Sequence, residues 1–300
     1  MNLLVTGAFA LSVQELDMLK RLGHTVVFMQ QESDNLPCEY SFVEGVIGNG
    51  IFLHHPIEKF TSLKYIQLTS AGFDRVPMDY VKEHEISIFN AKGVYSVPMA
   101  EFAVCGVFQF YKQLNFFRTN HLQHKWEKHR HLFEFCGKTV AIVGCGNVGT
   151  ECAKRFRAFG CVVKGVDVNP YQCTEYDEML SLNDLKTVLS TADIVVLTLP
   201  LTDETYHLIN DEYLQSVKPC AVLVNISRGA VVDTDALINA LNKECLLGAV
   251  LDVFEEEPLN ENSPLWDMDN VILTPHNSFV GEYNHERMWN VILRNLKGAL

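Results

Sequence analysis

The sequence predicts an α/β protein built from two doubly wound domains, each a parallel sheet covered by helices, with a cleft between them. Short apolar runs alternate with amphipathic segments along the chain, which is the pattern of parallel strands joined by helices. The length of 300 residues fits two domains of about 150 residues each. A glycine-rich turn at residues 144–149 follows one apolar run and opens a helical pattern, so it lies within a second α/β series.

The N-terminal part of the chain, about residues 1–90, is expected to form the first sheet. Ser12 to Leu22 predicts a helix that ends at Gly23, and Val76 to Glu83 predicts a short helix. Pro77 falls in the first turn of the second helix, where its missing N–H costs nothing. The expected strands are Leu3–Val5, Val26–Phe28, Val43–Ile47, Tyr65–Leu68 and Ile86–Phe89.

A long connector precedes the second series. Apolar residues at helical spacing from Met99 to about His121 predict one helix of more than twenty residues, which would link the two domains. The connector ends at Gly137-Lys138, and a final helix is expected from Gly281 to Leu300. The strands of the second sheet are continuous apolar runs, as expected where both faces are covered: Thr139–Val143, Val162–Val166, Ile194–Leu199, Ala221–Asn225, Leu246–Val250 and Val271–Leu273.

Composition and charge exclude several classes of protein. With 37 acidic and 24 basic residues, the formal net charge is −13, which argues against nucleic acid or an anionic membrane as a partner. The nine cysteines include no C-x-x-C pair and are expected to be reduced thiols. The start of the chain lacks the basic segment of a signal peptide. No apolar run approaches the roughly 18 residues that span a bilayer. We therefore expect a cytoplasmic protein.

The glycine-rich turn Gly144-Cys145-Gly146-Asn147-Val148-Gly149 predicts a Rossmann domain, because it lies between the strand 139–143 and a helix expected from Asn147 to Phe159. Gly144 allows the tight turn, Gly146 lets the backbone approach a pyrophosphate, and Gly149 allows close packing of helix and strand. Asp167 follows eighteen residues later at a strand end, where a carboxylate can take the ribose hydroxyls. No Arg or Lys directly after it could receive a 2′-phosphate, so NAD is favoured over NADP.

Three further motifs place titratable or charged side chains after apolar runs: Asn225-Ile226-Ser227-Arg228-Gly229, Leu251 to Pro258 with Glu257, and Leu273-Thr274-Pro275-His276. Arg228 can grip a carboxylate with two parallel hydrogen bonds and polarise the adjacent carbonyl. His276 can act as general acid in reduction and as general base in oxidation. Glu257 can pair with His276, orient it and favour its protonated form. This set suits hydride transfer to a 2-keto acid, with a nicotinamide carrying the hydride.

With Leu199-Pro200-Leu201-Thr202 between the glycine turn and Arg228, the order of motifs resembles the D-isomer-specific 2-hydroxyacid dehydrogenase family. This family includes D-lactate, glycerate, hydroxypyruvate and 3-phosphoglycerate dehydrogenases. The resemblance runs from Thr69-Ser70-Ala71-Gly72-Phe73-Asp74 to the region after His276. It implies NAD-dependent reduction of a 2-keto acid to the D-2-hydroxy acid, the reverse reaction, and a homodimer. Glu257 is selected over Glu255 and Glu256 because it directly precedes Pro258.

The resemblance also assigns further site residues and domain bounds. It implies a flavodoxin-like substrate domain from residues 1–95 plus 277–300 and an NAD-binding Rossmann domain from residues 96–276, closing over the substrate by hinge motion. The substrate carboxylate would contact Ser70, Ala71 and Gly72 in addition to Arg228 and His276. The cofactor-binding residues would be Gly144, Gly146, Asn147, Val148, Gly149, Asp167, Leu199, Pro200, Thr205, Ile226, Ser227 and Asp252.

Two departures bear on the substrate. Asn277-Ser278-Phe279-Val280-Gly281 places a bulky ring where the family usually has small residues. Val46-Ile47-Gly48-Asn49-Gly50 offers no arginine where phosphoglycerate-type members carry one, although Arg75 lies nearby in sequence. We therefore expect a small or medium, non-phosphorylated 2-keto acid, with Tyr95 and Phe279 shaping an apolar pocket.

Other interpretations remain open at this point. Arg228 could be a surface turn residue, Glu257 part of a solvated acidic loop, and His276 a structural histidine. An NAD(H)-sensing, corepressor-like binding protein of the same fold is the alternative function. An L-2-hydroxyacid dehydrogenase would carry its glycine turn near the N-terminus, and a formate dehydrogenase would carry glutamine in place of Glu257. The histidines His121, His124, His129 and His131 are interpreted as a solvated connector rather than a metal site. Cys145 is interpreted as a packing residue, or as oxidation-sensitive if the helix N-terminus stabilises its thiolate.

Overall fold

The computed structural model describes residues 1–298 and divides the chain into two compact units. The terminal unit comprises Met1–Val94 and the chain from Glu282 onward, and the central unit comprises Tyr95–Gly281. The sequence assigned residues 277–281 to the first domain, but they pack with the central unit. The reason is that the backbone N–H groups of Asn277 and Ser278 donate hydrogen bonds to the carboxylate of Asp252.

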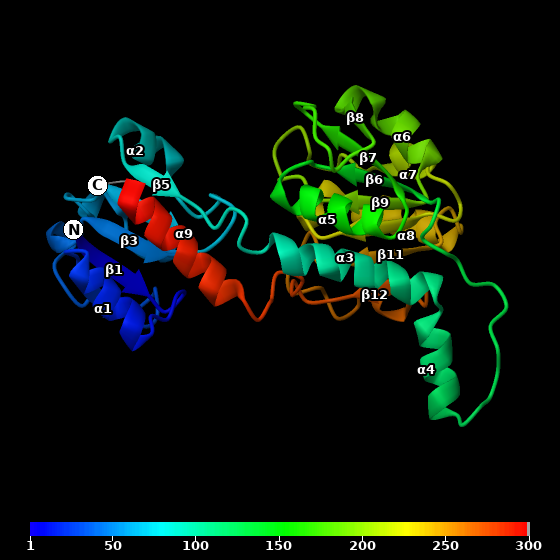
Figure 1. Ribbon diagram of the computed structural model, residues 1–300, viewed down its shortest axis with the longest axis horizontal. Helices are drawn as coiled ribbons and strands as arrows, with labels where there is room; N and C mark the ends of the chain where they lie inside the picture. Colours follow the sequence, from blue (N-terminus) through cyan, green and yellow to red (C-terminus); the bar gives the residue numbers. More distant parts are fainter. Residues whose placement is uncertain (299–300) are drawn as a thin grey trace. The chain divides into compact units, whose positions relative to one another are not determined.

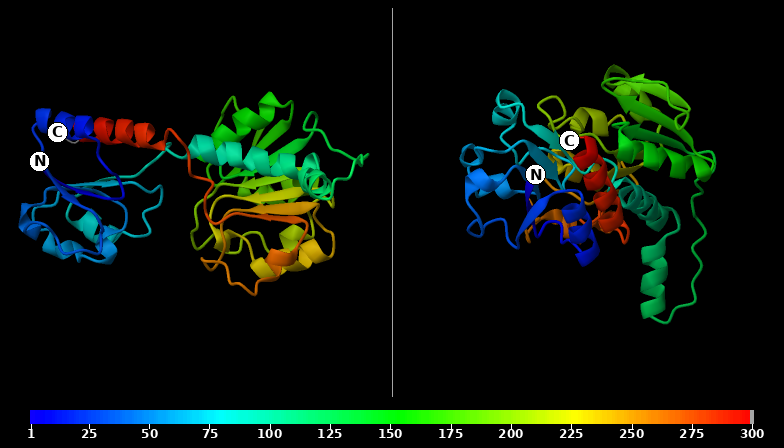
Figure 2. Two further views of the ribbon diagram at one scale, coloured as in Figure 1. Left: turned by 90° about the horizontal axis from the view of Figure 1, so that it is seen from below. Right: turned by 60° about the vertical axis from the view of Figure 1, so that its left-hand side comes forward.

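Within residues 1–298, the terminal unit contains a parallel sheet in the order β2-β1-β3-β4-β5, which confirms the predicted α/β architecture. Helices α1 (Val13–Arg21) and α9 (Asn284–Gly298) cover one face, and α2 (Met78–Glu83) covers the other, as Figure 2 shows. The expected end of the last helix at Leu300 lies outside the described residues. The strands are β1 (Asn2–Thr6), β2 (Thr25–Met29), β3 (Gly45–Gly48), β4 (Tyr65–Leu68) and β5 (Ser87–Phe89).

Two helices of the terminal unit are joined by a buried carboxylate. Ser12 caps α1, and its backbone N–H and hydroxyl donate to Glu15 Oε2 at 2.7 Å each. The other oxygen of Glu15 lies 2.8 Å from His285 Nε2 on α9. The imidazole of His285 stacks on the ring of Phe9, with the two centroids 4.6 Å apart. Glu15 therefore connects the first and last helices of the unit.

The central unit, all of whose residues are described, has a seven-stranded parallel sheet in the order β12-β11-β10-β9-β6-β7-β8. Counted from β6, this is the strand order of a Rossmann fold with one strand added at the edge. The short edge strand β8 was not predicted. The strands are β6 (Thr139–Val143), β7 (Val162–Asp167), β8 (Glu178–Ser181), β9 (Ile194–Leu197), β10 (Val222–Asn225), β11 (Gly248–Leu251) and β12 (Val271–Leu273).

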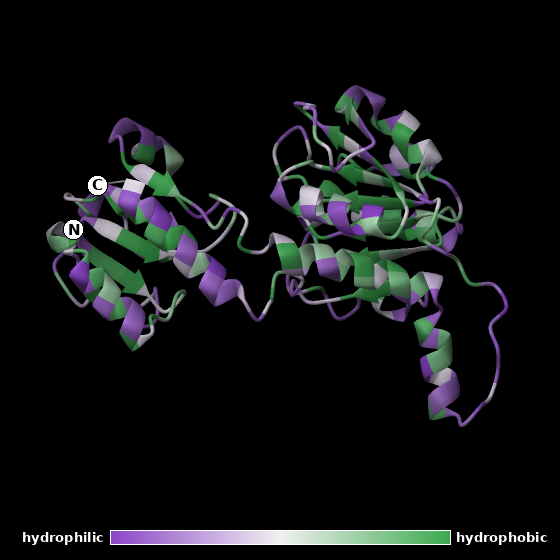
Figure 3. Ribbon diagram, viewed as in Figure 1, coloured by the Kyte–Doolittle hydropathy of each residue, from purple (hydrophilic) through white to green (hydrophobic). Residues whose placement is uncertain are grey.

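Both faces of the central sheet are covered (Figure 1). Alternate residues of β6 show this, because Val140 and Ile142 belong to one buried cluster and Ala141 and Val143 to another. Helices α3 (Ser96–Tyr111) and α5 (Asn147–Ala158) cover the first face, and α6 (Leu185–Thr191), α7 (Asp211–Leu214) and α8 (Thr234–Asn242) cover the second. The strands of both units are correspondingly hydrophobic (Figure 3). Short 3-10 turns lie at Tyr40–Phe42, Ile51–Leu53, Ile57–Lys59, Leu182–Asp184, Gly229–Val231 and Pro264–Asp267.

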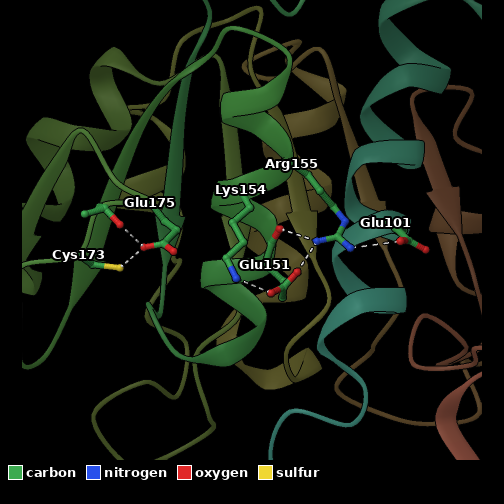
Figure 4. A network of polar contacts seen from close by, with 7 residues as sticks. Glu101, Glu151, Lys154, Arg155, Cys173 and Glu175 are labelled. Atoms are coloured by element: carbon green, nitrogen blue, oxygen red, sulfur yellow. Dashed lines mark hydrogen bonds and ion pairs between the residues drawn. The ribbon is translucent and has the colours of Figure 1, made fainter. Parts of the chain in front are cut away.

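Helices α3 and α5 are also joined by charged side chains (Figure 4). Arg155 donates to Glu151 Oε2 at 2.6 Å within α5 and to Glu101 Oε1 at 3.2 Å on α3. Lys154 donates to the other oxygen of Glu151 at 2.8 Å. On the side of α3 that faces the sheet, a Cβ added at Gly106 would lie 2.6 Å from a methyl carbon of Val250. The absence of a side chain there lets α3 lie directly on β11.

The single long helix predicted from Met99 to His121 is wrong. The structure has α3 and a separate helix, α4 (Leu114–Leu122), interrupted at Gln113, whose φ of +52° is left-handed. A left-handed residue cannot continue a right-handed helix, and no glycine or proline marks the break in the sequence. Helix α4 and the segment after it extend away from the rest of the central unit (Figure 1). A pocket between them is lined by residues 117, 120, 121 and 125–130 and contains none of the predicted catalytic residues.

In residues 1–298, no group of three or more His, Cys, Asp or Glu side chains is placed to hold a metal ion, and this includes the histidines between 121 and 131. No helix in the same range is both long and apolar enough to cross a membrane.

The contact between Glu15 and His285 predicts a pH dependence of stability. Burial acts to raise the pKa of Glu15, but the hydrogen bonds from Ser12 and His285 outweigh it and hold this pKa below its ordinary value. A carboxyl with a lower pKa in the folded state stabilises the protein above its unfolded pKa, and this contribution is lost as the pH falls through the folded pKa. Glu15→Gln should lower the free energy of unfolding at pH 7 by about 1–2 kcal/mol and reduce its acid dependence.

The measurement is the free energy of unfolding in urea, followed from pH 7 down to the lowest pH at which the protein is still folded. Glu212→Gln, which removes an exposed ion pair with Lys186, is the control and should change little. An acid dependence of Glu15→Gln equal to that of the wild type would contradict the assignment.

Candidate active site

The glycine-rich turn after β6 is held by close backbone packing. Gly144 has a φ of +97°, a conformation that glycine adopts without strain, and its N–H donates to Val166 O at 2.8 Å. A Cβ at Gly144 would lie 2.5 Å from the backbone nitrogen of Leu199. A Cβ at Gly149 would lie 2.2 Å from the carbonyl oxygen of Gly144. Neither position admits a side chain, so β6, α5 and the end of the β9 segment meet closely at this turn.

Gly146 differs from the other two glycines, because no neighbouring atom lies within 4 Å of a Cβ added there. It is exposed and is the N-cap of α5. The N-terminus of a helix presents N–H groups and the positive end of its dipole, which together bind phosphate. Exposed backbone, open space and a helix N-terminus therefore fit the pyrophosphate of a dinucleotide.

Asp167 lies beside this turn at the end of β7. Its Oδ2 accepts a hydrogen bond from Cys145 N at 2.7 Å, and its Oδ1 accepts one from Asn169 N at 3.0 Å. The hydroxyl of Tyr171 donates to Cys145 O at 2.6 Å. These bonds fix the carboxylate against the glycine turn, a position that suits the ribose of an adenosine bound there.

Cys145 is a packing residue. It is 1% exposed, and burial raises the pKa of its thiol to about 12. Its sulfur lies 3.7 Å from the carbonyl oxygens of Ile142 and Val166, where a protonated thiol can donate. The hypothesis that the helix N-terminus stabilises a reactive thiolate is wrong, since the side chain turns into the core.

Asp252, directly after β11, has a fully buried carboxylate. Its Oδ1 accepts from Thr274 Oγ1 at 2.7 Å and from Asn277 N at 2.8 Å, and its Oδ2 accepts from Ser278 N at 2.9 Å. Its backbone carbonyl accepts from His276 N at 2.8 Å. These bonds hold the loop after β12 against the end of β11, and His276 adopts a left-handed φ of +50° within it.

The predicted pair of His276 and Glu257 is present in the structure. His276 Nδ1 lies 2.8 Å from Glu257 Oε2, and Glu257 Oε1 accepts from Phe254 N at 3.0 Å. The carboxylate is thus fixed on one side by the backbone and on the other by the imidazole. The side chains are 43% and 36% exposed, so Nδ1 is engaged while the ring stays accessible. This is the arrangement in which a carboxylate orients an imidazole that exchanges protons through Nε2.

Arg228 follows β10 in a turn held by Asn225. Asn225 Oδ1 accepts from Ser227 Oγ at 2.8 Å, and its Nδ2 donates to Arg228 O at 3.1 Å. A Cβ at Gly229 would lie 1.8 Å from the carbonyl carbon of Phe254. Glycine at 229 is therefore required for the Arg228 turn to lie on the backbone of the loop that carries Glu257.

A second carboxylate on that loop was missed by sequence reasoning. Glu255 accepts from Thr234 N at 2.9 Å and from Thr234 Oγ1 at 2.5 Å, at the start of α8. Its other oxygen lies 2.8 Å from His207 Nε2. Glu255 thereby connects the loop that carries Glu257 to the start of α8 and to His207. The sequence shows three consecutive glutamates, and nothing in it separates the anchor from its neighbours.

The other residues predicted to bind the cofactor lie around the same end of the central sheet. Thr205 Oγ1 donates to Pro200 O at 2.7 Å and accepts from Thr202 N at 2.7 Å, which closes the loop after β9. Leu199 and Ile226 are buried, at 6% and 1% exposed, so their side chains pack in the core. Asn147 is exposed at the start of α5, and the half-buried Val148 packs against the core below it.

Two aromatic rings lie in a row beside His276. The ring of Phe279 meets the imidazole edge to face, with centroids 6.0 Å apart, and the ring of Tyr95 lies 5.7 Å from Phe279. Burial raises the pKa of Tyr95. The structure thus brings together the two aromatic residues that the sequence singled out.

Ser70, Ala71 and Gly72 belong to the terminal unit, in the loop after β4. Ser70 O accepts from Ala91 N at 2.8 Å, and Ala71 O accepts from Asn90 Nδ2 at 2.6 Å. The hydroxyl of Ser70 donates to Gly72 O at 3.0 Å. The loop is therefore fixed by its carbonyl groups at the carboxyl end of the sheet.

Comparison with known proteins identifies the family. Residues 104–278 match the model of the D-isomer specific 2-hydroxyacid dehydrogenase NAD binding domain. A glyoxylate reductase of Thermofilum pendens is 36% identical over 245 residues, which is 80% of this chain and 72% of the relative. An (S)-sulfolactate dehydrogenase of Chromohalobacter salexigens is 32% identical over 81% of this chain and 80% of the relative.

A solved structure of a D-isomer specific 2-hydroxyacid dehydrogenase family protein from Aeromonas salmonicida matches with a TM-score of 0.83. It is 28% identical, and the match covers 99% of this chain and 94% of the neighbour. The chain belongs to the D-isomer-specific 2-hydroxyacid dehydrogenase family. It is an NAD-dependent oxidoreductase of 2-keto and 2-hydroxy acids, as the sequence predicted. The homodimer and the cytoplasmic location stay predictions.

The hydrogen bonds of Asp252 predict how the site responds when its carboxylate is replaced by an amide. In Asp252→Asn, the amide NH₂ replaces one acceptor oxygen and faces a backbone N–H donor. A buried donor without a partner costs about 1–3 kcal/mol, and the loop that carries His276 should shift. Both unfolding stability and kcat should therefore fall.

Asp193→Asn is the matched control. Asp193 is a buried carboxylate of the same unit that accepts from Thr139 N at 2.9 Å, at the opposite end of the strands. This variant should lose stability but keep kcat at a temperature where it is folded. If kcat fell equally in the two variants, the effect of Asp252→Asn could not be attributed to the loop that carries His276.

Proposed function

We propose that this enzyme reduces a small or medium, non-phosphorylated 2-keto acid to the D-2-hydroxy acid and catalyses the reverse reaction. His276 is the general acid and base, Glu257 its partner, and Arg228 the ligand of the substrate carboxylate. The observation that carries the proposal is the 2.8 Å contact between His276 Nδ1 and Glu257 Oε2, in a loop fixed by Asp252.

The reaction needs one proton at the carbonyl oxygen and one hydride at the carbonyl carbon. Arg228 binds the substrate carboxylate through its guanidinium, and its charge polarises the adjacent carbonyl. His276, protonated and oriented by Glu257, donates a proton from Nε2 to the oxygen as negative charge develops there. The glycine turn of residues 144–149 would hold NADH, whose nicotinamide would supply the hydride. In the reverse direction, neutral His276 accepts the proton of the hydroxyl.

Other residues complete the proposed site. The expectation that the substrate carboxylate also contacts Ser70, Ala71 and Gly72 stays a prediction. The rings of Tyr95 and Phe279 border the substrate side chain, which their contact beside His276 supports. A small substrate is also supported by the relative named glyoxylate reductase.

The catalytic roles predict distinct kinetic effects. His276→Ala should lower kcat by about 10²–10⁴-fold, because the proton donor is lost. Arg228→Ala should lower kcat/KM by about 10–100-fold through loss of hydrogen bonds to a charged group. NADH oxidation at 340 nm is measured with pyruvate, glyoxylate, hydroxypyruvate, 2-ketoisocaproate, phenylpyruvate and phosphohydroxypyruvate. His84→Ala, at an exposed histidine of α2's C-cap, is the control.

The alternative function is tested by the same panel. If no acid is reduced while NADH still binds, the proposal is overturned and an NAD(H)-sensing, corepressor-like protein is favoured. Turnover that His276→Ala leaves intact would remove His276 from the mechanism.

The aromatic border predicts a change in side-chain preference. Phe279→Ala should raise kcat/KM for phenylpyruvate relative to glyoxylate by about tenfold or more, since added room at an apolar pocket changes discrimination by this amount. Val280→Ala alters the neighbouring side chain, which is 56% exposed, and should leave the ratio unchanged. Equal ratios in wild type and Phe279→Ala would place the substrate side chain elsewhere.

A further inference from the structure

Tyr171, in the segment after β7, reaches back to the glycine-rich turn of the central unit. Its hydroxyl donates a hydrogen bond to the carbonyl oxygen of Cys145 at 2.6 Å, a normal length for an O–H donor. The carboxylate of Asp167 accepts from the N–H of the same cysteine at 2.7 Å. Both backbone groups of Cys145 are therefore held by side chains from the end of β7 and the segment that follows it. Tyr171 is not among the residues predicted to bind the cofactor.

The neighbouring carbonyl groups of the turn are held as well. Gly144 O accepts from Thr198 Oγ1 at 2.5 Å, and Gly146 O accepts from Thr150 N of α5 at 2.9 Å. By contrast, in the described part of the chain no group accepts a hydrogen bond from the N–H groups of residues 146–148. The turn thus engages its carbonyl groups within the protein and leaves N–H groups for a ligand, which is the arrangement that a pyrophosphate needs.

The peptide between Cys145 and Gly146 depends on Tyr171 for its orientation. In a planar trans peptide the C=O and N–H groups point in opposite directions. Because the C=O of Cys145 is directed at Tyr171, the N–H of Gly146 points away from it. Packing gives little further restraint, since no neighbouring atom lies within 4 Å of a Cβ added at Gly146, and glycine permits many backbone conformations. Rotation of this peptide would turn a carbonyl oxygen, in place of the N–H, toward a bound pyrophosphate.

We propose that Tyr171 is a positioning residue for the cofactor, whose hydroxyl holds the Cys145–Gly146 peptide so that the Gly146 N–H stays available to the pyrophosphate of NAD. This inference rests on the proposed function only in placing NADH at the turn of residues 144–149. It does not depend on the roles of His276 and Arg228. The affinity for NADH, and not the rate of hydride transfer, should therefore depend on the Tyr171 hydroxyl.

The test removes the hydroxyl and keeps the ring, in Tyr171→Phe. The Kd of NADH, measured by the fluorescence of the nucleotide, should rise about three- to tenfold, because one hydrogen bond is lost. ADP, which carries the pyrophosphate, should lose affinity by the same factor in competition with NADH, whereas adenosine should compete as it does with wild type. At saturating NADH, kcat should stay within about twofold of wild type, as expected for a change in binding alone.

Tyr111→Phe is the matched control. The hydroxyl of Tyr111 also donates to a backbone carbonyl of the central unit, that of Asp193 at 3.4 Å, but at the opposite end of the strands. Its removal should leave the Kd of NADH and of ADP unchanged. If Tyr171→Phe binds NADH and ADP as wild type does, or loses ADP and adenosine affinity equally, the inference is overturned.

A further variant separates this inference from the proposed function. Gly146→Glu places a carboxylate in the open space at the N-terminus of α5 and should abolish NADH binding. If Gly146→Glu binds NADH as wild type does, the cofactor position in the proposed function is wrong, and the inference fails with it. If Gly146→Glu loses NADH while Tyr171→Phe keeps it, only the inference is overturned. If wild type reduces no 2-keto acid, the catalytic part of the proposed function fails, and the affinities for NADH and ADP still decide the role of Tyr171.

Discussion

The buried carboxylate of Asp252 is the constraint on which the geometry of the candidate site depends. A carboxylate without contact to water is stable only when hydrogen bonds replace its hydration. The donors that serve it are the Thr274 hydroxyl and two N–H groups of residues 277 and 278. To supply them, the chain after β12 bends back over the end of β11. This bend gives His276 its left-handed backbone and directs its imidazole at Glu257.

At the other strand ends of the central sheet, close contacts between backbone segments hold the site residues in place. Gly229 lets the turn of Arg228 rest on the peptide between Phe254 and Glu255, and Gly144 and Gly149 do the same where β6, the β9 segment and α5 meet. Because all strands of the central sheet are parallel, their carboxyl ends lie on one side. The cofactor turn and the three catalytic candidates therefore gather there, although up to 132 residues separate Gly144 from His276 in the chain.

Acidic side chains perform several structural tasks in this protein, which the formal charge of −13 does not reveal. Asp252 and Glu255 anchor loops, Glu15 joins two helices, and Glu32 connects the ends of β1 and β3 by accepting from the Thr6 hydroxyl and Gly50 N. Each accepts hydrogen bonds from backbone or side-chain donors, so each carboxylate is held in one place, whether it is fully buried like Asp252 or exposed like Glu255. In the sequence they look like surface residues, since nothing local to an acidic residue says which donors will face it after folding.

The sequence by itself determined the elements whose signal is local. The glycine turn, the continuous apolar strands of the second sheet and the order of the catalytic motifs were readable because each depends on neighbouring residues and known spacings. The tertiary structure decided features that depend on distant partners. The break at Gln113, the edge strand β8, the attachment of residues 277–281 to the central unit and the inward turn of Cys145 are examples. The break at Gln113 is left-handed at a residue other than glycine, so no glycine marks it in the sequence. The thiol of Cys145 is buried because it packs against residues far away in the chain, such as Val166, and no short sequence window contains that information.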